Sequence, residues 1–316
     1  MRKFLAMSAS IVALLFLVTA CETTTNPDPV KTAPNAPTDL MASSTNETTV
    51  TLKWSKAATG QEPTGYIVSF LEAGAVQPQS VAISGSATTT AAIQGLTEGK
   101  LYAFSVRAVN DTAKSDPSAS VTWAPAKRYS GTFKLYSSQS TTEGSGLSLK
   151  TGTVLKLADA DKWEFCFDDK DGRPLVGSPG VSGYNAPSGK EFPIVSLDTT
   201  IAHMTRANSL NDVFDVRALD NVAAGSFTEA LINLADPRLQ PTTGVALIVR
   251  SRVDQTTVNF AKVLIKPNLA GNSWVFGTGA NSYIECEVSY QTVTNVPYAE
   301  MQRLFGGAKR GNHSVE

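Results

Sequence analysis

The sequence predicts an all-β fold, with one β-sandwich domain followed by a larger, mainly-β sandwich domain that contains two short helices. Three observations support this fold class. From about residue 37 onward, apolar and polar residues alternate along many short segments, as in strands with one buried face. Turn-forming Gly, Pro, Asn and Asp residues separate these segments. Helical spacing of apolar residues appears in only two short segments.

The N-terminus carries the features of an export signal. The basic opening MRK precedes a mostly apolar stretch over 4–20, which ends in small residues before Cys21. This stretch is shorter than the roughly 20 residues of a membrane-spanning helix, and no basic flank follows it. The tetrapeptide VTAC that ends at Cys21 resembles the lipobox of bacterial lipoproteins. The resemblance implies a signal peptide over 1–20 and a lipid on Cys21, whereas the alternative is an ordinary secretory signal followed by a cysteine.

A lipid on Cys21 would place the chain in the cell envelope, with the membrane as the partner of its N-terminus. Lipoproteins carry several acyl chains, and each buried methylene contributes about 0.8 kcal/mol, so the anchor would be permanent. Glu22 follows the cysteine in place of an aspartate, which in this family favours the outer membrane and leaves open which side the protein faces. Residues 21–36 are rich in Pro, Thr and Asn, which predicts a disordered tether.

Residues 37–126 alternate as a two-sheet sandwich requires. The segments TVTLKW, GYIVSF and LYAFSVRAVN each place apolar residues on one face. The order APTDL, VTLKW, GYIV and IQGLTEGKLYAFSVRAVN resembles a fibronectin type III domain. The resemblance implies that Trp54 is the core tryptophan of the second strand and that Leu96 and Tyr102 form the tyrosine corner. It also implies a non-catalytic spacer or interaction module.

Residues 127–316 resemble no family with comparable specificity, but they are again rich in strand-like segments such as GVALIVRSRV and YIECEVSYQTV. A capping-box pattern begins at Ser226, and apolar residues follow it at helical spacing until Pro237, which predicts the first helix. The second predicted helix begins at Pro297 and ends before Gly306. We expect both helices to pack on the core of this domain.

Cys166 and Cys286 are the remaining cysteines of a chain that is expected to be exported. Such a pair suggests a disulfide, which would contribute roughly 4 to 5 kcal/mol for a loop of this length in the chain-entropy model. However, Cys286 shares a strand face with Ile284, whereas Cys166 alternates with Phe165 and Phe167, so the two thiols can lie on faces that do not meet. Two hypotheses stay open, a disulfide and two buried free thiols.

The other polar motifs give little support for metal or catalytic sites. The segment DDKDGRP over 168–174 lacks the spacing of a calcium loop, and its Asp-Gly pair between apolar runs predicts a hairpin turn. We therefore expect no metal and no cofactor. The two histidines, His203 and His313, are not accompanied by a Gly-x-Ser-x-Gly motif for a Ser-His-acid relay. A net charge of −1 without basic blocks argues against nucleic acid as a partner.

The leading functional hypothesis is a non-enzymatic, lipid-anchored envelope protein with a binding, adhesion or structural role. Its expected partner is a protein or a polysaccharide of the envelope. Polysaccharide binding predicts an exposed strip of aromatic side chains, namely Trp163, Tyr184, Trp274 and Tyr283. Capture of haem or another nutrient predicts a pocket with His203 as the ligand. A carbohydrate-active enzyme predicts two carboxylates about 5 to 10 Å apart in a cleft. The candidates for that pair are Asp159, Asp161, Glu164 and Asp168.

Overall fold

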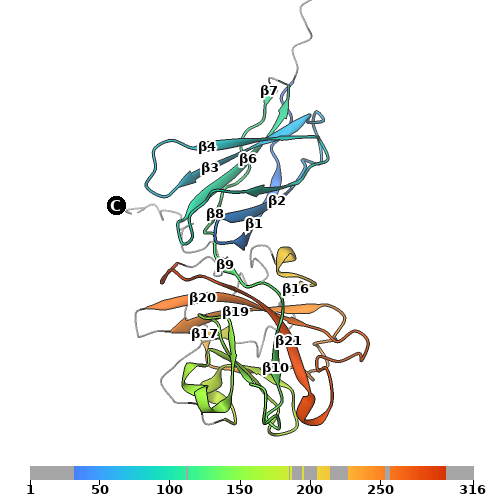
Figure 1. Ribbon diagram of the computed structural model, residues 1–316. Coiled ribbons are helices and arrows are strands. Elements are labelled where there is room, and N and C mark those ends of the chain that lie inside the picture. Colours follow the sequence, from blue (N-terminus) through green and yellow to red (C-terminus); the bar gives the residue numbers. More distant parts are fainter. Residues whose placement is uncertain are drawn as a thin grey trace, which may run out of the picture. The chain divides into compact units, whose positions relative to one another are not determined.

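The computed structural model describes most of the chain from Thr32 onward (Figure 1). The described residues are 32–111, 113–184, 186, 194–195, 205–213, 227–252 and 257–296. Within them the secondary structure is almost entirely antiparallel β-strand, so the predicted all-β class is confirmed.

The first domain is a sandwich of a three-stranded and a five-stranded sheet. The three-stranded sheet has the order β1-β2-β5, with β1 (Thr38–Asn46), β2 (Thr49–Ser55) and β5 (Thr90–Ile93). The five-stranded sheet has the order β4-β3-β6-β7, and β8 also pairs with β6. Its strands are β3 (Gly65–Glu72), β4 (Gln79–Ser84), β6 (Tyr102–Asn110), β7 (Ala113–Lys114) and β8 (Val121–Trp123).

The alternation seen in the sequence forms the core of this domain. Val50, Leu52 and Trp54 lie on the inner face of β2 and are fully or almost fully buried. The ring of Trp54 meets that of Tyr66 on β3 edge to face, with 5.2 Å between the ring centroids. Since apolar burial is the main favourable term in folding, these facing rows hold the two sheets together.

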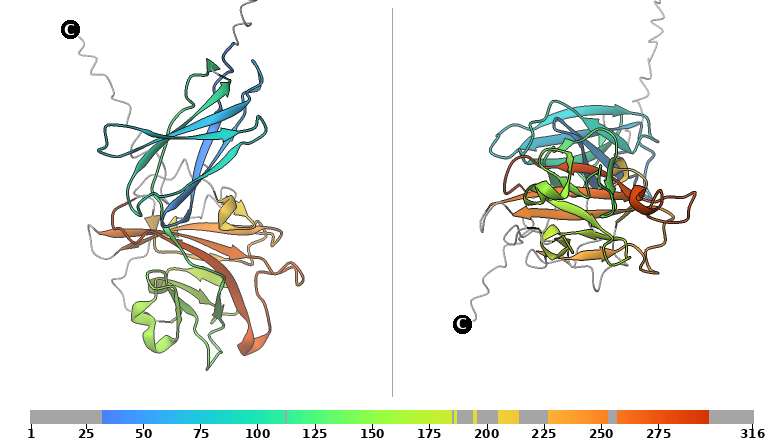
Figure 2. Two further views of the ribbon diagram at one scale, coloured as in Figure 1. Left: turned by 45° about the horizontal axis from the view of Figure 1, so that its top comes forward. Right: turned by 60° about the horizontal axis from the view of Figure 1, so that its bottom comes forward.

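The second domain combines a five-stranded and an eight-stranded sheet (Figure 2). The five-stranded sheet has the order β12-β11-β13-β14-β18, with β11 (Gly146–Ser148), β12 (Thr153–Leu155), β13 (Phe165–Asp168), β14 (Leu175–Gly177) and β18 (Leu231–Asn233). The eight-stranded sheet has the order β10-β21-β20-β19-β15-β17, and β16 pairs with β19 and β9 with β21. Its strands are β9 (Lys127–Arg128), β10 (Phe133–Tyr136), β15 (Ile194–Val195), β16 (Thr205–Ala207), β17 (Phe227–Thr228), β19 (Gly244–Arg252), β20 (Val258–Lys266) and β21 (Tyr283–Tyr290).

Apolar side chains from both sheets fill the core of the second domain. Leu147 and Phe165 of the smaller sheet belong to the same buried cluster as Val263 and Ile284 of the larger one. Beside this core, a Cβ atom on Gly146 would come within 2.0 Å of the Trp163 ring. The tryptophan can therefore lie directly on the backbone of β11 only because this position is glycine.

The prediction of a helix that begins at Ser226 is wrong. Residues 227–228 and 231–233 form the strands β17 and β18, and Ile232 pairs with Val176 of β14. Short apolar runs are ambiguous between the two periods, and here the free edge of β14 provides hydrogen bonds that favour a strand. The second predicted helix, from Pro297, lies outside the described residues. The helical turns that the structure describes are short 3₁₀ segments, namely η1 (Leu157–Lys162), η2 (Pro179–Val181), η4 (Leu210–Asp212) and η6 (Gly279–Asn281).

A buried junction connects the two sandwiches along the chain. Ala124 and Ala126 have no exposed surface, and the side-chain amide of Gln291 donates to the carbonyl of Pro125 at 3.0 Å. Residues from Thr32 onward form one compact unit. Within the described part, no helix is both long and apolar enough to span a bilayer.

Candidate functional site

The eight-stranded sheet carries a charged network on the face that points away from the core. Side chains alternate along β21, so Cys286 is buried in the core while Glu285 and Glu287 lie on the opposite face. In the register of the two strands, Glu285 pairs with Lys266 of β20. This register places the Lys266 ammonium group close to Glu287 as well.

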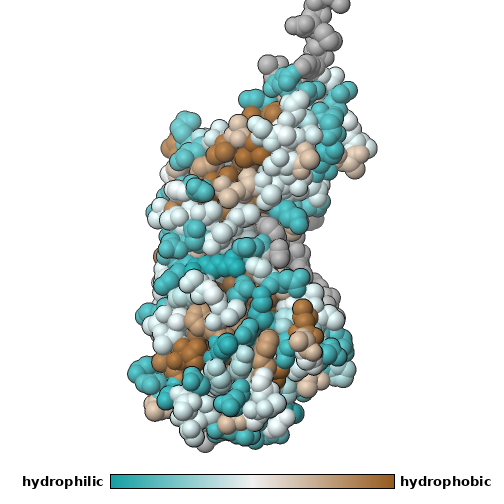
Figure 3. Space-filling model, turned by 45° about the vertical axis from the view of Figure 1, so that its right-hand side comes forward, coloured by the Kyte–Doolittle hydropathy of each residue, from teal (hydrophilic) through white to brown (hydrophobic). Residues whose placement is uncertain are grey.

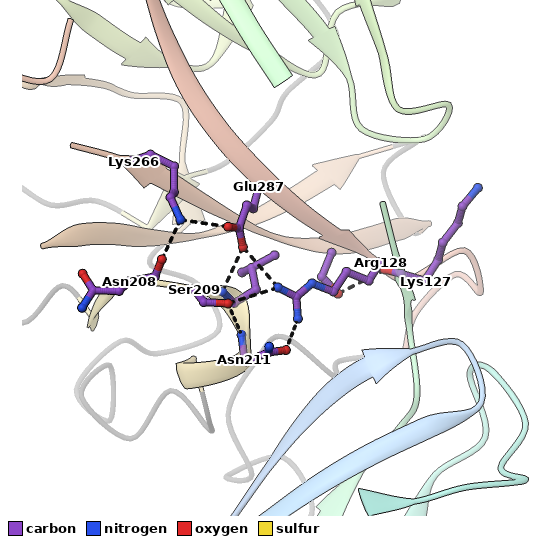
Figure 4. A network of polar contacts seen from close by, with 9 residues as sticks. Lys127, Arg128, Asn208, Ser209, Asn211, Lys266 and Glu287 are labelled. Carbon is purple, nitrogen blue, oxygen red and sulfur yellow. Dashed lines mark hydrogen bonds and ion pairs between the residues drawn. The ribbon is translucent and has the colours of Figure 1, made fainter. Parts of the chain in front are cut away.

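Glu287 is the centre of this network, which Figure 4 shows from close by. Its Oε1 atom accepts from Lys266 Nζ at 2.9 Å, and its Oε2 atom accepts from Arg128 Nη2 and from the backbone N of Leu210, both at 3.1 Å. Lys266 also donates to the carbonyl of Asn208 at 2.6 Å. The side chains of Arg128 and Glu287 are each only 16% exposed, so solvent weakens this pair less than a surface ion pair.

Arg128 reaches this carboxylate from strand β9, which pairs with β21. Its guanidinium group also donates to the side-chain oxygen of Asn211 and to the hydroxyl of Ser209 (Figure 4). Since a guanidinium presents several donors in a fixed plane, one side chain can hold three acceptors at once. The network thereby fixes the segment 208–211 to the outer face of the sheet.

The charges of the network favour the ionised form of Glu287. Partial burial acts to raise the pKa of this carboxyl group. The hydrogen bonds from Lys266 and Leu210, together with the positive charges of Lys266 and Arg128, outweigh burial and hold the pKa below its ordinary value. The carboxylate therefore stays charged at neutral pH and serves as a fixed acceptor.

A pocket of about 420 Å³ opens beside the network. Its lining consists of Thr45, Arg128, Tyr129, Ser130, Gly131, Thr132 and Glu287. The hydroxyl of Tyr129 donates to the carbonyls of Leu149 and Lys150, and burial is the main cause that raises the pKa of this phenol to about 12. The hydroxyl groups and two charged side chains of this lining can bind a small polar ligand through hydrogen bonds, and the Tyr129 oxygen can act as an acceptor.

The residues that were predicted to form the tyrosine corner of the first domain lie in its core. Leu96 and Tyr102 are each 4% exposed. The Tyr102 hydroxyl accepts from the backbone N of Thr97 and donates to Glu72, both at 3.1 Å. This phenol thus ties the loop before β6 to the end of β3, which is a structural role. Cys21, the residue expected to carry lipid, lies outside the described residues, as does His203.

The two cysteines that the structure describes are free and buried, so the disulfide hypothesis is overturned in favour of two free thiols. Cys286 belongs to the core between the sheets, whereas Cys166 lies in a separate cluster with Trp163 and Tyr184. The physical reason is the strand alternation, because Phe165 points toward the shared core and Cys166 therefore points away from it. Burial raises the pKa of both thiols, which keeps them protonated.

The four aromatic residues that the sequence suggested as a binding strip do not form one. Trp163, Tyr184 and Trp274 are at most 6% exposed, and Trp163 and Tyr184 pack against each other edge to face at 5.1 Å. Tyr283 is half-buried and stacks on Phe276, with 5.3 Å between the ring centroids. Three of the four are therefore core residues.

The acidic residues form turns and short-range contacts. Strands β13 and β14 flank the segment 168–174 and pair with each other, so the predicted hairpin is present. Asp168 is buried and accepts from the backbone N of Gly183 at 2.6 Å, and Asp159 pairs with Lys162 on the surface. Glu164 accepts from the hydroxyl of Ser251 at 2.7 Å. Asp159, Glu164 and Asp168 thus each have a structural partner, and Asp161 is exposed in η1.

Sequence reasoning missed the Arg128 and Glu287 pair. The alternation of YIECEVSY places Glu285 and Glu287 on one strand face, which is a usable indication of a charged surface. The partner of Glu287 lies 159 positions away in the chain, and no pattern in the sequence connects the two residues.

Comparisons with known proteins concern the first domain. A family model of the fibronectin type III domain matches residues 35–124, so this part of the chain is a fibronectin type III domain. The receptor-type tyrosine-protein phosphatases F of Bos taurus and Homo sapiens are both 39% identical to this chain over 93 residues. That match covers 29% of this chain and only 5% of each phosphatase.

Solved structures resemble the same part of the chain. A fibronectin type III domain of human collagen XX is 19% identical, and the match covers 30% of this chain and 96% of that one with a TM-score of 0.26. The FN5 domain of Drosophila Lar is 22% identical, and the match covers 29% of this chain and 97% of that one with a TM-score of 0.25.

Proposed function

We propose that this chain is a non-enzymatic, lipid-anchored protein of a bacterial cell envelope, with a binding, adhesion or structural role. The observation that carries the proposal is the order of its parts: a lipobox-like VTAC ending at Cys21, a proline-rich segment, and then a fibronectin type III domain over 35–124. A lipid at the N-terminus holds a protein at a membrane, and a domain of this type commonly acts as a spacer or an interaction module.

The second sandwich is the part to which we assign recognition. The pocket beside Arg128 and Glu287, which Thr45 of the first domain also lines, offers hydrogen-bond donors and acceptors within a lining that the charged network holds in place. Pre-organised polar groups in a concave site are what the binding of a small polar ligand requires. This polar lining favours a sugar unit of an envelope polysaccharide over a flat apolar cofactor such as haem.

The anchor is tested by replacing its cysteine. In the producing cell, Cys21→Ser should abolish incorporation of labelled palmitate and move the protein from the membrane fraction to the soluble fraction. Cys166→Ser is the matched control, because it removes a buried thiol and leaves the N-terminus intact. Labelling that persists in Cys21→Ser would rule out Cys21 as the lipidated residue, and membrane retention without labelling would point to another form of attachment.

Recognition is tested by binding of the mature chain, residues 21–316, to a panel of polysaccharide fragments and to haem. We expect a saturable increase in melting temperature with a sugar, which Thr132→Val in the pocket lining should weaken by about tenfold. Thr278→Val is the control, since Thr278 is exposed and lies outside that lining. Equal loss in both variants, or binding of haem alone, would contradict the assignment.

A further inference from the structure

Strand β4 is an open edge of the fibronectin type III domain. It pairs with β3 in unbroken register, from Gly65 opposite Ser84 to Phe70 opposite Gln79. In the part of the chain that the structure describes, β3 is its only strand partner. All six residues of β4 are exposed except Ile83, which is half-buried. The backbone donors and acceptors on the other side of β4 are therefore available to a further strand.

The chain segment that contains this edge carries no charged side chain. From Ala73 to Thr97 the sequence contains no Asp, Glu, Lys, Arg or His. Two of the exposed large apolar residues of the described part belong to the same segment, namely Val76, which is 86% exposed, and Val81, which is 39% exposed. On the face drawn in Figure 3, apolar residues form groups among polar ones. A six-residue strand without charge or proline is the type of edge that pairs with other chains.

Other edges of the described sheets carry features that hinder such pairing. Strand β1 contains Asp39 and two irregularities in its register with β2. Strand β10 is four residues long and contains Lys134. Strands β5, β12 and β18 are three or four residues long. Since charged residues, bulges and short length are the usual ways in which proteins protect sheet edges, β4 stands out as the unprotected one.

We propose that β4 is a homodimerisation edge, on which β4 of a second copy of this chain adds in antiparallel orientation. The two strands would join the sheets of two fibronectin type III domains into one continuous sheet around a two-fold axis.

A second copy fits this edge better than a charged partner does. In an antiparallel pair of identical strands, residue i lies opposite residue j and j opposite i, and only a residue on the two-fold axis lies opposite its own copy. An uncharged strand therefore brings no like charges together in any such register. Val81 lies opposite the buried Val68 of β3, at the open side of the sandwich. Addition of a strand would cover part of this side chain. Because the contact is made of backbone hydrogen bonds and apolar surface, the dimer should be insensitive to salt.

The test measures self-association of the mature chain, residues 21–316, with Cys21→Ser so that no lipid is attached. Sedimentation velocity over a wide range of concentration should show a reversible monomer–dimer equilibrium that added salt leaves unchanged. Val81→Lys should weaken dimerisation by about tenfold or more, because it places two ammonium groups near each other at the pairing edge. Val76→Lys is the matched control, since it makes the same change at a more exposed valine outside the strand.

Hydrogen exchange of the unsubstituted chain gives a second readout that does not depend on variants. Amides of 79–84 should become protected as concentration rises, while those of the short edge β5 should not. A monomer at every concentration would overturn the proposal and leave the edge available to a strand from another protein. Equal effects of Val76→Lys and Val81→Lys would also overturn it, because they would indicate contact through the loop and not through the strand.

Discussion

The two sandwich domains differ in how they hold charged side chains. Among the described residues, the buried side chains of the fibronectin type III domain are apolar or bear hydroxyl groups, whereas the second sandwich buries Asp168 and Lys262. The ammonium group of Lys262 donates to the carbonyl of Val213 at 3.2 Å and lies 4.5 Å from the Trp123 ring centroid. Burial of a charge is costly without such partners, so the second sandwich depends on specific polar contacts.

The difference suggests a division of labour. A domain with an apolar core keeps its stability over a wide range of pH and salt, which suits a support or spacer. A domain that holds charges in partly buried networks responds to pH and to the loss of single polar groups, which suits recognition. The following predictions test this comparison, from the largest expected effect to the smallest.

The core of the first domain should be the most sensitive to truncation of one side chain. Trp54→Ala removes an almost fully buried ring that packs against Tyr66, and we expect it to lower the free energy of unfolding by about 3 to 5 kcal/mol. Urea unfolding followed by circular dichroism measures this change. Val76→Ala, at an exposed site, should change it by less than about 0.5 kcal/mol. A small effect of Trp54→Ala would mean that polar contacts, and not the apolar core, stabilise this domain.

The charged network should contribute less to the free energy of unfolding than the Trp54 side chain, but the contribution should still be measurable. Glu287→Gln leaves Arg128 and Lys266 without their carboxylate, and we expect a loss of about 1 to 3 kcal/mol in the free energy of unfolding. The control is Glu285→Gln, because Glu285 pairs with the half-exposed Lys134 across 3.9 Å and should matter by less than about 0.5 kcal/mol. If both variants behave alike in chemical denaturation, the network is only a surface ion pair.

Loss of side-chain hydrogen bonds in the first domain should lower the free energy of unfolding by less than loss of the Glu287 carboxylate. Tyr102→Phe removes the acceptor of the Thr97 amide and the donor to Glu72, which should cost about 1 kcal/mol. Thermal unfolding is a suitable measurement. Tyr283→Phe is the matched control in the second sandwich, where the half-buried hydroxyl receives only a 3.4 Å contact from Lys134. A larger loss in the control would reverse the comparison between the domains.

The fold of the first domain could be predicted because the sequence patterns that indicate it are local. Alternation over a few residues determines which face of β2 is buried, and the spacing from Leu96 to Tyr102 is short enough to read in one loop. The pattern after Ser226 shows the limit of this reasoning. Its apolar residues fit a helix, but pairing of Ile232 with Val176, which is distant in sequence, makes the segment a strand.

The candidate site was harder to predict for the same reason. Glu287 receives Arg128 from β9, Lys266 from β20 and the backbone of Leu210 from η4, so the site exists only after several distant segments have come together. The disulfide question shows the opposite case, since strand alternation alone indicated that Cys166 and Cys286 can face away from each other. Local periodicity thus indicates which side chains share a strand face, whereas the contact partners of a side chain are set by the tertiary fold.

The smallest effect that we expect is a dependence on pH. The folded-state pKa of Glu287 is lower than the ordinary value of 4.5, so the unfolded chain binds the proton more readily than the folded one. The stabilisation by this group is therefore fully present above about pH 4.5 and is lost as the pH falls through the lower folded-state pKa. Urea unfolding between pH 6 and about pH 3 should show a steeper loss of stability for the unsubstituted chain than for Glu287→Gln. Parallel curves would mean that the acid sensitivity of this sandwich originates in other carboxylates.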